Sequence, residues 1–257
     1  MDDSLAIIIL AAGLGKRMGS ATPKVLSKVG DMTLIEHVLS CADSLHPQKT
    51  VVVIGHKGEL VKEVVTQGVK LGRYSNNISF AVQQEMRGTG DAAKSALPFL
   101  QDFTGTVLIL CGDIPLIRPQ SLKALLKTHS DSKATVSLIS MRVTAENAYG
   151  RIVRDKDGYV LKIVEFKDCN DTEKELTEAN TGIYAVDSAF LAPALTGLTN
   201  DNAQGEYYLT DIVDRAAREG QTVAASLHED PTEFLGVNTP ADLDLIKQAL
   251  ERRQVSN

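Results

Sequence analysis

Residues 5–18 read LAIIILAAGLGKRM, and this stretch decides how the rest of the chain is interpreted. The apolar run over 5–10 is short and continuous, which is typical of a strand buried on both faces. Four small residues follow it: Ala11, Ala12, Gly13 and Gly15. Small residues let the backbone approach a ligand and offer free N–H groups to phosphate oxygens. Lys16 and Arg17 come with them, so the stretch predicts either a phosphate-binding loop or a tight turn with solvated cations.

Two well-known phosphate-binding patterns do not fit this loop. A dinucleotide fingerprint needs a third glycine where Met18 stands. A P-loop needs glycine at Leu10 and serine or threonine at Arg17. Lys24, after Pro23, adds another cation, and Arg and Lys both bind phosphate, as a planar fork and as a point charge. On the local pattern alone, phosphate binding and an ordinary turn remain equally open.

Outward from this stretch, apolar runs alternate with helical patterns as far as residue 141. The strand-like runs are 50–54, 78–82, 106–110 and 134–141. The helical patterns are 33–42, 60–69, 91–99 and 120–128. Such alternation predicts a Rossmann-like α/β fold, a mixed and mainly parallel sheet with right-handed crossovers and flanking helices.

The second part of the chain is less regular. Asp157-Gly158 between apolar runs predicts a hairpin of residues 151–154 and 159–165. Polar residues 167–178 predict an exposed loop. Further strands are expected at 182–186, 223–227 and 234–237, and helices at 208–218 and 241–253. There is no linker-like or repetitive segment, so we expect one domain over residues 1–257, with a nucleotide-binding half at about 1–140.

Composition excludes several classes of protein. Hydrophobic residues make up 43% of the 257, enough for a sizeable core and too many for a disordered chain. The net charge of -6 argues against broad binding to nucleic acid or to an anionic membrane surface. The three cysteines form no CxxC pair, and no signal peptide or membrane span is evident. We therefore expect a reduced, cytoplasmic protein.

Further motifs, taken in chain order, give the chain a resemblance to a known family. They are Gln83 with RGTG at 87–90, CGDIPL at 111–116, YGRI at 149–152, IVE at 163–165, NTGI at 180–183, NAQGEYYLTD at 202–211 and GVN at 236–238. With the opening loop and Pro23-Lys24, this set resembles the sugar-phosphate nucleotidyltransferases over essentially the whole chain. It looks closest to the N-terminal uridylyltransferase (pyrophosphorylase) domain of the bifunctional enzymes that make UDP-N-acetylglucosamine. The resemblance implies the nucleotide-diphospho-sugar transferase architecture, with sugar binding in the half at about 141–257.

The resemblance also implies a role for each matching residue. The catalytic residues would be Arg17, Lys24 and Asp113. The nucleotide would be bound by Leu10, Ala11, Ala12, Gly13, Gly15, Lys16, Gln83, Gly88 and Thr89. The sugar would be bound by Cys111, Gly112, Gly150, Glu165, Asn180 and Thr181. A magnesium ion would be held by Asp113 and Asn238.

Without the resemblance, these residues have plainer interpretations. Asp113 follows a predicted strand, where ligands of open α/β sheets collect, but aspartate is also a common turn residue. Asn238 precedes Pro240 and is equally well suited to cap a helix. The Gln83 amide complements the polar edge of uracil, yet glutamine at a strand end is usually only exposed. Glu165 suits a sugar hydroxyl and equally a solvated strand end.

The implied reaction joins UTP to a sugar-1-phosphate and releases pyrophosphate. The attacking phosphate monoester has a second pKa near 6, so it is ionised at neutral pH and needs no general base. Alignment and charge neutralisation then supply the catalysis. Arg17 and Lys16 would hold the β- and γ-phosphates and Lys24 the region of the α-phosphate, with Mg²⁺ on Asp113 and Asn238.

Three other interpretations stay open: the same chemistry on another sugar-1-phosphate or nucleotide, a nucleotide-sugar glycosyltransferase, and a non-catalytic nucleotide-sugar sensor. Glycosyltransferases of this kind usually carry an Asp-x-Asp metal site, and Cys111 stands two residues before Asp113. Cys111 also departs from the family, which often has an aromatic there. The sequence ends at Asn257, before any hexapeptide-repeat β-helix, so we expect no acetyltransferase activity and infer no oligomeric state. The expected partners are UTP and a sugar-1-phosphate, without nucleic acid or membrane.

Overall fold

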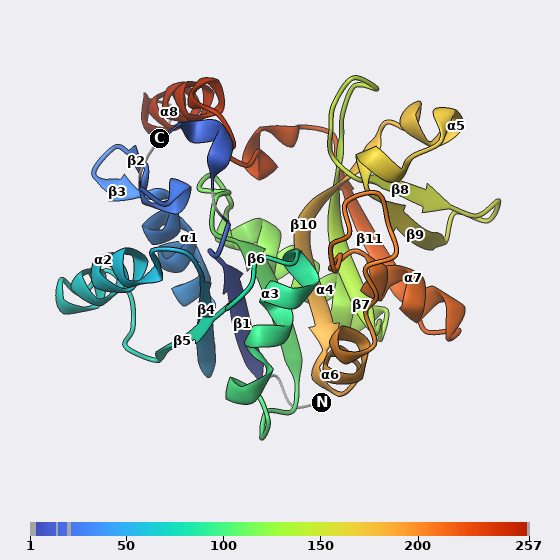
Figure 1. The fold of residues 1–257 in the computed structure, drawn as a ribbon, viewed down its shortest axis with the longest axis horizontal. Coiled ribbons are helices and arrows are strands. Elements are labelled where there is room, and N and C mark those ends of the chain that lie inside the picture. The colour runs from blue at the N-terminus through green and yellow to red at the C-terminus, as the bar shows by residue number, and fades with distance from the viewer. Residues whose placement is uncertain (1–3, 14, 20–21, 256–257) are drawn as a thin grey trace.

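A central sheet with helices on both faces organises the molecule, as the computed structural model shows for residues 4–13, 15–19 and 22–255 (Figure 1). The strands of this sheet are β1 (Leu5–Leu10), β4 (Lys49–Ile54), β5 (Ile78–Val82), β6 (Thr106–Cys111), β7 (Val136–Arg142), β8 (Arg151–Arg154), β9 (Val160–Val164), β10 (Glu178–Asp187) and β11 (Val223–His228). The main path runs β11-β7-β10-β6-β1-β4-β5, and β8 joins β10 to β9. A small separate sheet pairs β2 (Lys28–Val29) with β3 (Met32–Thr33).

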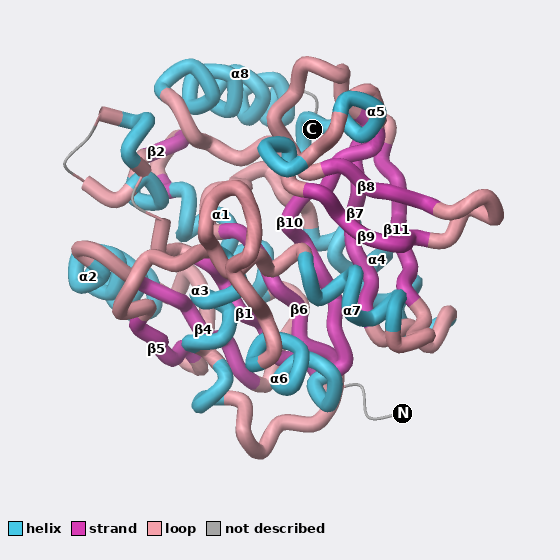
Figure 2. Tube along the Cα trace, turned by 45° about the vertical axis from the view of Figure 1, so that its right-hand side comes forward, coloured by secondary structure: helices cyan, strands magenta, loops and turns pink. Residues whose placement is uncertain are grey.

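The helices lie on both sides of this sheet and across one end of it (Figures 1 and 2). They are α1 (Leu34–Asp43), α2 (Gly58–Lys70), α3 (Thr89–Ser95), α4 (Pro119–Asp131), α5 (Asp171–Lys174), α6 (Ser188–Thr196), α7 (Asp211–Arg218) and α8 (Pro240–Val255). Short 3₁₀ turns are η1 (Lys16–Met18), η2 (Lys24–Leu26), η3 (Leu97–Phe99), η4 (Phe166–Asp168) and η5 (Pro231–Phe234). None of the helices in the described ranges is long and apolar enough to span a membrane.

The first half of the sheet is parallel. β1 lies between β4 and β6, with Ile8 opposite Val51 on one side and Ile109 on the other. Ile7, Ile8 and Ile9 are fully buried, because helices cover both faces of this strand. The continuous apolar run thus forms the two-sided buried strand that the sequence predicts.

The second half mixes strand directions. β10 is antiparallel to both β6 and β7, whereas β11 is parallel to β7. The register of β10 against β7 shifts between Asn180 and Tyr184, which marks a bulge. The β8–β9 hairpin joins the sheet through Ala179 and Arg151. The mixed, mainly parallel sheet that the sequence predicts is confirmed.

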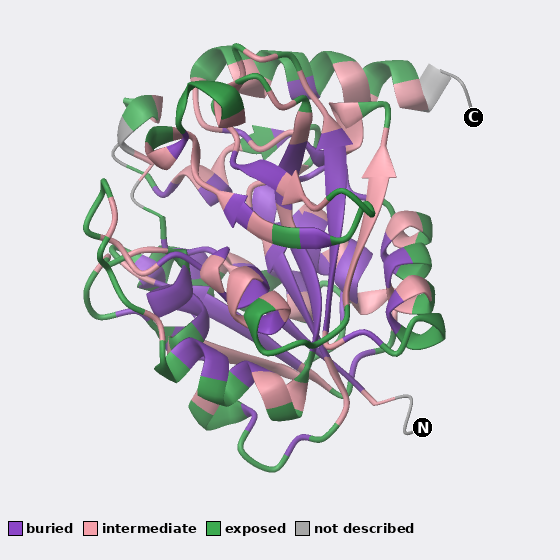
Figure 3. Ribbon diagram, turned by 90° about the vertical axis from the view of Figure 1, so that its right-hand side faces the viewer, coloured by how far each residue is buried: buried purple, intermediate pink, exposed green. Residues whose placement is uncertain are grey.

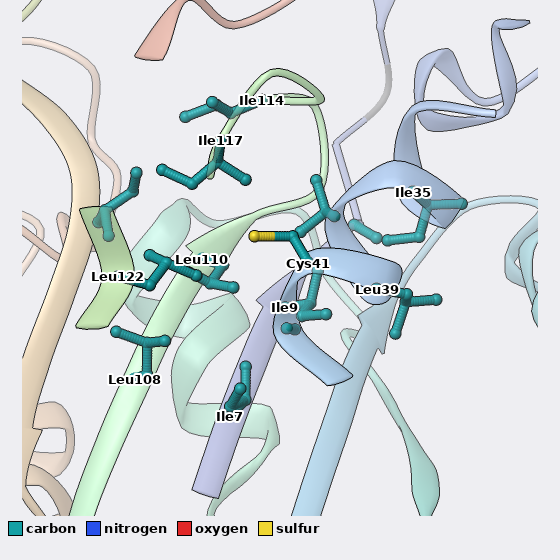
Figure 4. Close-up of a cluster of buried hydrophobic side chains, with 14 of the residues drawn as sticks. Ile7, Ile9, Ile35, Leu39, Cys41, Leu108, Leu110, Ile114, Ile117 and Leu122 are labelled. Atoms are coloured by element: carbon teal, nitrogen blue, oxygen red, sulfur yellow. The ribbon is translucent and has the colours of Figure 1, made fainter. Parts of the chain in front are cut away.

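Two apolar layers hold the helices against the sheet (Figure 3). On one face α1, α2 and α4 pack on alternate residues of the strands, and Figure 4 shows Ile35 and Leu39 of α1 near Ile9 of β1. On the other face α3, α6 and α7 pack on the remaining residues, including Ile8 and Ile109. The period of two along each strand sends side chains to both layers, so both faces of the parallel strands are covered.

Three sequence expectations differ from the structure. The strand expected at 234–237 is wrong: Asp230 caps a 3₁₀ turn by accepting a bond from the Thr232 N–H, and Phe234 ends that turn buried against His228. The exposed loop expected at 167–178 contains α5, which Asn170 starts through a capping box. Helix α6 is present where the sequence predicts none, and it contains Pro193 in its interior.

Candidate active site

A cavity of about 620 Å³ opens at the carboxyl ends of β1, β5 and β6. The described residues that line it are Leu10, Ala11, Ala12, Gly13, Gly15, Arg17, Lys24, Val25, Gln83, Met86, Gly88, Thr89, Ala92, Cys111, Asp113, Gln204 and Glu206. Most of the residues expected to bind a nucleotide are among them. This is the edge of an open α/β sheet at which ligands bind.

The loop after β1 forms one wall of the cavity. Ala11 donates its N–H to the Val53 carbonyl at 2.9 Å, which continues the pairing with β4 beyond the strand. Gly15 has φ of +59°, and a Cβ there would lie 2.9 Å from the Lys24 Cβ. Glycine is therefore required for Lys24 to approach the loop. The side chain of Lys16 lies outside the described part of the structure, whereas Arg17 is exposed on the wall.

The Lys24 ammonium joins residues from three distant parts of the chain. It donates to Asp113 Oδ2 at 2.5 Å and to Asn238 Oδ1 at 2.8 Å. Backbone contacts fix the two partners together, since Val237 donates its N–H to the Asp113 carbonyl at 3.0 Å. The structure thus brings Lys24, Asp113 and Asn238 into one cluster, although Asn238 is not among the described residues that line the cavity.

This cluster suits a hard divalent cation. One carboxylate and one amide oxygen face a common point, at which the structure has the positive charge of Lys24. Mg²⁺ is held in such sites by one or two protein oxygens, with the rest of its ligands from water and phosphate. Across the described ranges there is no group of three or more His, Cys, Asp or Glu able to hold a metal. The donor set therefore fits Mg²⁺ shared with a phosphate substrate and does not suit a closed, all-protein metal site.

Gln83 and Gly88 form the wall opposite the β1 loop. The Gln83 side chain is buried, with 4% exposed, and its Nε2 donates to the Gly88 carbonyl at 3.1 Å and to Asp91 Oδ2 at 3.0 Å. Gly88 has φ of +112°, and a Cβ there would lie 2.5 Å from the Tyr207 carbonyl oxygen. The Thr89 hydroxyl accepts a bond from the Leu209 N–H at 3.1 Å. These contacts tie the loop at 87–90 to the segment at 206–209.

A second group of expected residues meets at the ends of β8, β9 and β10. Gly150, Glu165 and Asn180 are the expected residues, and together with Thr210, to which sequence reasoning assigned no role, we call them the Glu165 cluster. Asn180 donates its backbone N–H to the Gly150 carbonyl at 2.9 Å, and a Cβ on Gly150 would lie 3.5 Å from Glu165 Oε2. Thr210 donates its hydroxyl to Glu165 Oε1 at 3.2 Å. None of the four is among the described residues that line the cavity.

Burial raises the pKa of the carboxyl group in the Glu165 cluster. The pKa of Glu165 is raised, first by burial and then by the negative charges of Asp211, Asp168 and Glu206, although the bond from Thr210 opposes this shift. The carboxylate form therefore gains most from a ligand that donates hydrogen bonds to it. A hydroxyl group of a sugar is such a donor.

Two of the expected sugar-binding residues have structural contacts of their own. The Thr181 hydroxyl, buried at the bulge of β10, donates to the Ile139 carbonyl at 2.7 Å. Gly112 donates its N–H to the Leu10 carbonyl at 2.9 Å, and a Cβ on it would lie 3.0 Å from Ile35 Cδ1. Gly112 therefore allows α1 to pack closely under the site, and Thr181 holds the bulge.

Cys111 connects the cavity with the second group. Its thiol lies 3.6 Å from the Gly182 carbonyl oxygen, beside the bulge of β10. Burial raises the pKa of Cys111 to about 12, and the charge of Asp113 adds to the shift. A thiol with so high a pKa is protonated at neutral pH and is a poor nucleophile.

Sequence reasoning missed the side of the cavity formed by Gln204 and Glu206. Gln204 is held by Tyr208, to whose hydroxyl it donates at 2.9 Å, and by Lys167, from which it accepts a bond at 2.7 Å. The motif at 202–211 contributes to the resemblance but predicts no role of its own. Its only signal is its place in the ordered set, because the contact with loop 87–90 spans more than a hundred residues of chain.

Comparison with known proteins identifies the family of this chain. Residues 6–231 match the family model described as nucleotidyl transferase. The chain is 43% identical over 251 residues, 98% of its length, to the bifunctional protein GlmU of Geotalea uraniireducens, and 42% identical over 246 residues to that of Streptococcus gordonii. It spans about half the length of these relatives, 53% and 52% respectively.

A solved structure matches over nearly the whole fold. The crystal structure of a UDP-glucose pyrophosphorylase complexed with UDP-glucose superimposes with a TM-score of 0.77, covering 97% of this chain and 99% of that one. Sequence identity is 16%, so this match concerns the fold.

Proposed function

This chain belongs to the nucleotidyl transferase family, and on that premise we propose that it is a uridylyltransferase joining UTP and N-acetylglucosamine-1-phosphate. The products are UDP-N-acetylglucosamine and pyrophosphate. The observation that carries the proposal is the cluster of Lys24, Asp113 and Asn238, assembled beside a cavity lined by the glycine-rich loop. Such a cluster suits the neutralisation of phosphate charge.

Each side of the site has a proposed ligand. The triphosphate lies along the loop after β1, with Arg17 and Lys16 at the β- and γ-phosphates. The base lies against Gln83 and Gly88. The sugar ring lies toward the Glu165 cluster, where the raised pKa of the carboxyl group favours a partner that donates hydrogen bonds. Residues 1–257 act in this proposal as one nucleotidyltransferase domain.

The proposed mechanism relies on alignment and on charge. The sugar phosphate attacks the α-phosphorus with an oxygen that is already ionised at neutral pH, so no side chain needs to remove a proton. The mobile ammonium of Lys24 exchanges its partner oxygens for the oxygens of the reacting phosphates. Asp113 and Asn238 would hold Mg²⁺, which would supply further neutralisation of the phosphates when bound.

A second candidate is the same reaction on glucose-1-phosphate. Cys111 stands near the proposed sugar position, where the family often has an aromatic, so the contacts to the ring differ. The three cysteines are free thiols, which supports the expectation of a reducing, cytoplasmic compartment.

The test is pyrophosphate release from the purified chain with UTP, Mg²⁺ and N-acetylglucosamine-1-phosphate. Parallel reactions replace the sugar by glucose-1-phosphate or glucosamine-1-phosphate, and UTP by CTP, dTTP, ATP or GTP. We expect Mg²⁺-dependent release with UTP and the N-acetyl sugar. Release with another pair would assign a different sugar or nucleotide to the enzyme and would leave the proposed type of reaction unchanged. Folded protein that releases pyrophosphate with no pair contradicts the proposal.

A further inference from the structure

A buried carboxylate lies behind the glutamine that faces the proposed base position. Asp91, in the first turn of α3, is 9% exposed, and its Oδ2 accepts a bond from Gln83 Nε2 at 3.0 Å. Its other oxygen, Oδ1, accepts a bond from Arg87 at 2.8 Å. The carboxylate therefore bridges a glutamine amide on one side and a guanidinium on the other.

These bonds fix which way the Gln83 amide points. The two groups that face its nitrogen, Asp91 Oδ2 and the Gly88 carbonyl, are both acceptors, so the NH₂ end of the amide must face them. Both amide hydrogens are thereby used within the protein. The end that remains for a ligand in the cavity is the oxygen, Oε1, which is an acceptor only.

The outer partner of Asp91 is itself held in place. Arg87 lies over the Tyr207 ring, 5.5 Å from its centroid, and its backbone carbonyl accepts a bond from the Tyr207 N–H at 2.7 Å. Its guanidinium also pairs with Glu85 at 3.3 Å. Because a guanidinium can only donate, the oxygen of residue 91 that meets it has to be an acceptor.

We propose that Asp91 is a specificity-determining residue that acts through Gln83: it fixes the amide so that only an acceptor meets the base. Uracil presents an N–H at N3 and can donate to that oxygen. Cytosine presents a lone pair at the same position, so acceptor would face acceptor and the base is rejected. The inference rests on the proposed function, because it assumes that a nucleotide base lies against Gln83. It places uracil and thymine in one accepted class and cytosine outside it.

The isosteric substitution Asp91→Asn tests the proposal. Arg87 will take the oxygen of the new amide, so its NH₂ group will face the NH₂ group of Gln83. Gln83 relieves this clash of donors by turning over, which gives up its bond to the Gly88 carbonyl and presents a donor to the cavity. We expect the ratio of kcat/KM for UTP to that for CTP to fall by about 10–100-fold, as when one buried hydrogen bond is lost. The KM for the sugar phosphate should not change.

A double variant separates the loss of Gln83 orientation from a general loss of structure at the site. In Arg87→Met with Asp91→Asn, no guanidinium claims the amide oxygen, so the new amide at position 91 is free to turn that oxygen toward Gln83 Nε2. We expect the UTP-to-CTP ratio to return to within about threefold of the wild-type value, while Arg87→Met alone leaves it unchanged. Asp91→Ala also lowers the ratio, but Arg87→Met does not rescue it, because alanine has no oxygen to offer.

The matched control is Glu85→Gln. It makes the same carboxylate-to-amide change on the other acidic partner of Arg87, at an exposed side chain, and it should leave the ratio unchanged. Calorimetric binding of UTP and CTP, without the sugar phosphate, gives the same comparison independently of turnover.

The outcomes separate this inference from the proposed function. If the wild type turns over no nucleotide, the proposed function fails, and the calorimetric ratios of the same variants decide the inference alone. A folded Asp91→Asn or Asp91→Ala protein that keeps the wild-type ratio overturns it. So does a wild type that shows no preference for UTP over CTP in either measurement.

Discussion

The cavity and the Glu165 cluster present polar groups in opposite ways. In the cavity, Lys24 and Asp113 carry opposite charges, lie within reach of solvent and hold each other by a direct ion pair. In the Glu165 cluster, the carboxyl group is partly buried like those two residues, but its pKa is raised and it is bonded to the neutral hydroxyl of Thr210. The two regions therefore differ in charge balance: the carboxylate in the cavity has a cation beside it, whereas Glu165 has burial and the negative charges of Asp211, Asp168 and Glu206 around it, which raise its pKa.

The comparison predicts that substitutions in the cavity cost mainly rate. Asp113→Asn removes the negative charge and keeps an oxygen for Lys24, so we expect kcat to fall by roughly 10³-fold. The free energy of unfolding should change by less than about 1 kcal/mol. Steady-state kinetics and urea unfolding measure the two effects. Asp102→Asn, at an exposed position, is the control and should change neither, and near-normal turnover of Asp113→Asn would remove Asp113 from the mechanism.

On the side of β8, the comparison predicts a cost in stability instead. Arg151 is fully buried and donates to the carbonyl oxygens of Tyr149, Asn147 and Ala145, with its guanidinium 5.0 Å from the Phe166 ring centroid. Arg151→Met leaves these carbonyls without donors, so unfolding should become easier by about 3 kcal/mol or more.

The urea midpoint and slope measure that change. Arg154→Met, which removes a partly exposed ion pair with Glu178, is the matched control and should cost about 1 kcal/mol or less. Equal losses in the two variants would show that burial of Arg151 is not what matters.

The raised pKa of Glu165 allows the comparison to be tested by measuring activity at several pH values. Its carboxylate form accepts hydrogen bonds, so the KM for the sugar phosphate should rise as pH falls through the raised pKa of Glu165. Glu165→Gln should raise this KM by about 10-fold at pH 8 and by less as the pH is lowered toward the raised pKa of Glu165. The sugar phosphate titrates equally with both proteins, so the ratio of the two KM values isolates Glu165. A ratio that stays constant as the pH is lowered until the protein begins to unfold would contradict the assignment.

The smallest expected effect concerns the edge of the same cluster. Burial and the charge of Asp214 raise the pKa of Asp211 to about 6 from 3.8. Because the folded state binds this proton more tightly than the unfolded state, the folded protein loses stability as pH rises from 3.8 through 6. Asp211→Asn removes the ionisable group, so this variant does not lose stability over that pH range.

We therefore expect Asp211→Asn to be more stable than the wild type by about 1 kcal/mol at pH 7.5 and equal to it near pH 4. Thermal unfolding at the two pH values measures this, with the exposed Asp201→Asn as control. A stabilisation that is the same at both pH values would assign the effect to something other than the titration of Asp211.

The parallel half of the fold could be read from the sequence because its strands are apolar runs, of which β1, β4 and β6 are buried on both faces. Runs such as residues 50–54 and 78–82 are apolar throughout most of their length, and each ends at a polar or glycine-rich turn. The residues expected to line a nucleotide site follow directly from those strand ends. Lys24 and Asn238 could be named from motifs. The contact between their side chains, beside Asp113, depends on the backbone bond between Asp113 and Val237.

The remainder could not be predicted from local patterns. Helix α6 depends on its cap at Asp187 and on packing, which overcome the interior Pro193. The orientation of Gln83 depends on Asp91, eight residues away in the first turn of α3. The wall that carries Gln204 reaches the cavity through bonds such as that of the Gly90 N–H to the Tyr207 carbonyl, 2.8 Å long. These features depend on tertiary contacts, which local sequence patterns do not predict.

The described hydrogen bonds of the Arg151 guanidinium all go to main-chain carbonyl oxygens, including that of Lys174 at 3.5 Å. None of these bonds goes to a carboxylate. A carbonyl oxygen is the same whichever side chain its residue bears. Ala145 can therefore exchange its side chain without loosening these contacts, provided that the path of the backbone is kept, whereas the Asn147 side chain also accepts a bond from the Tyr149 N–H. Position 145 is therefore a suitable place to attach a spectroscopic probe that reports on the β8 side of the molecule.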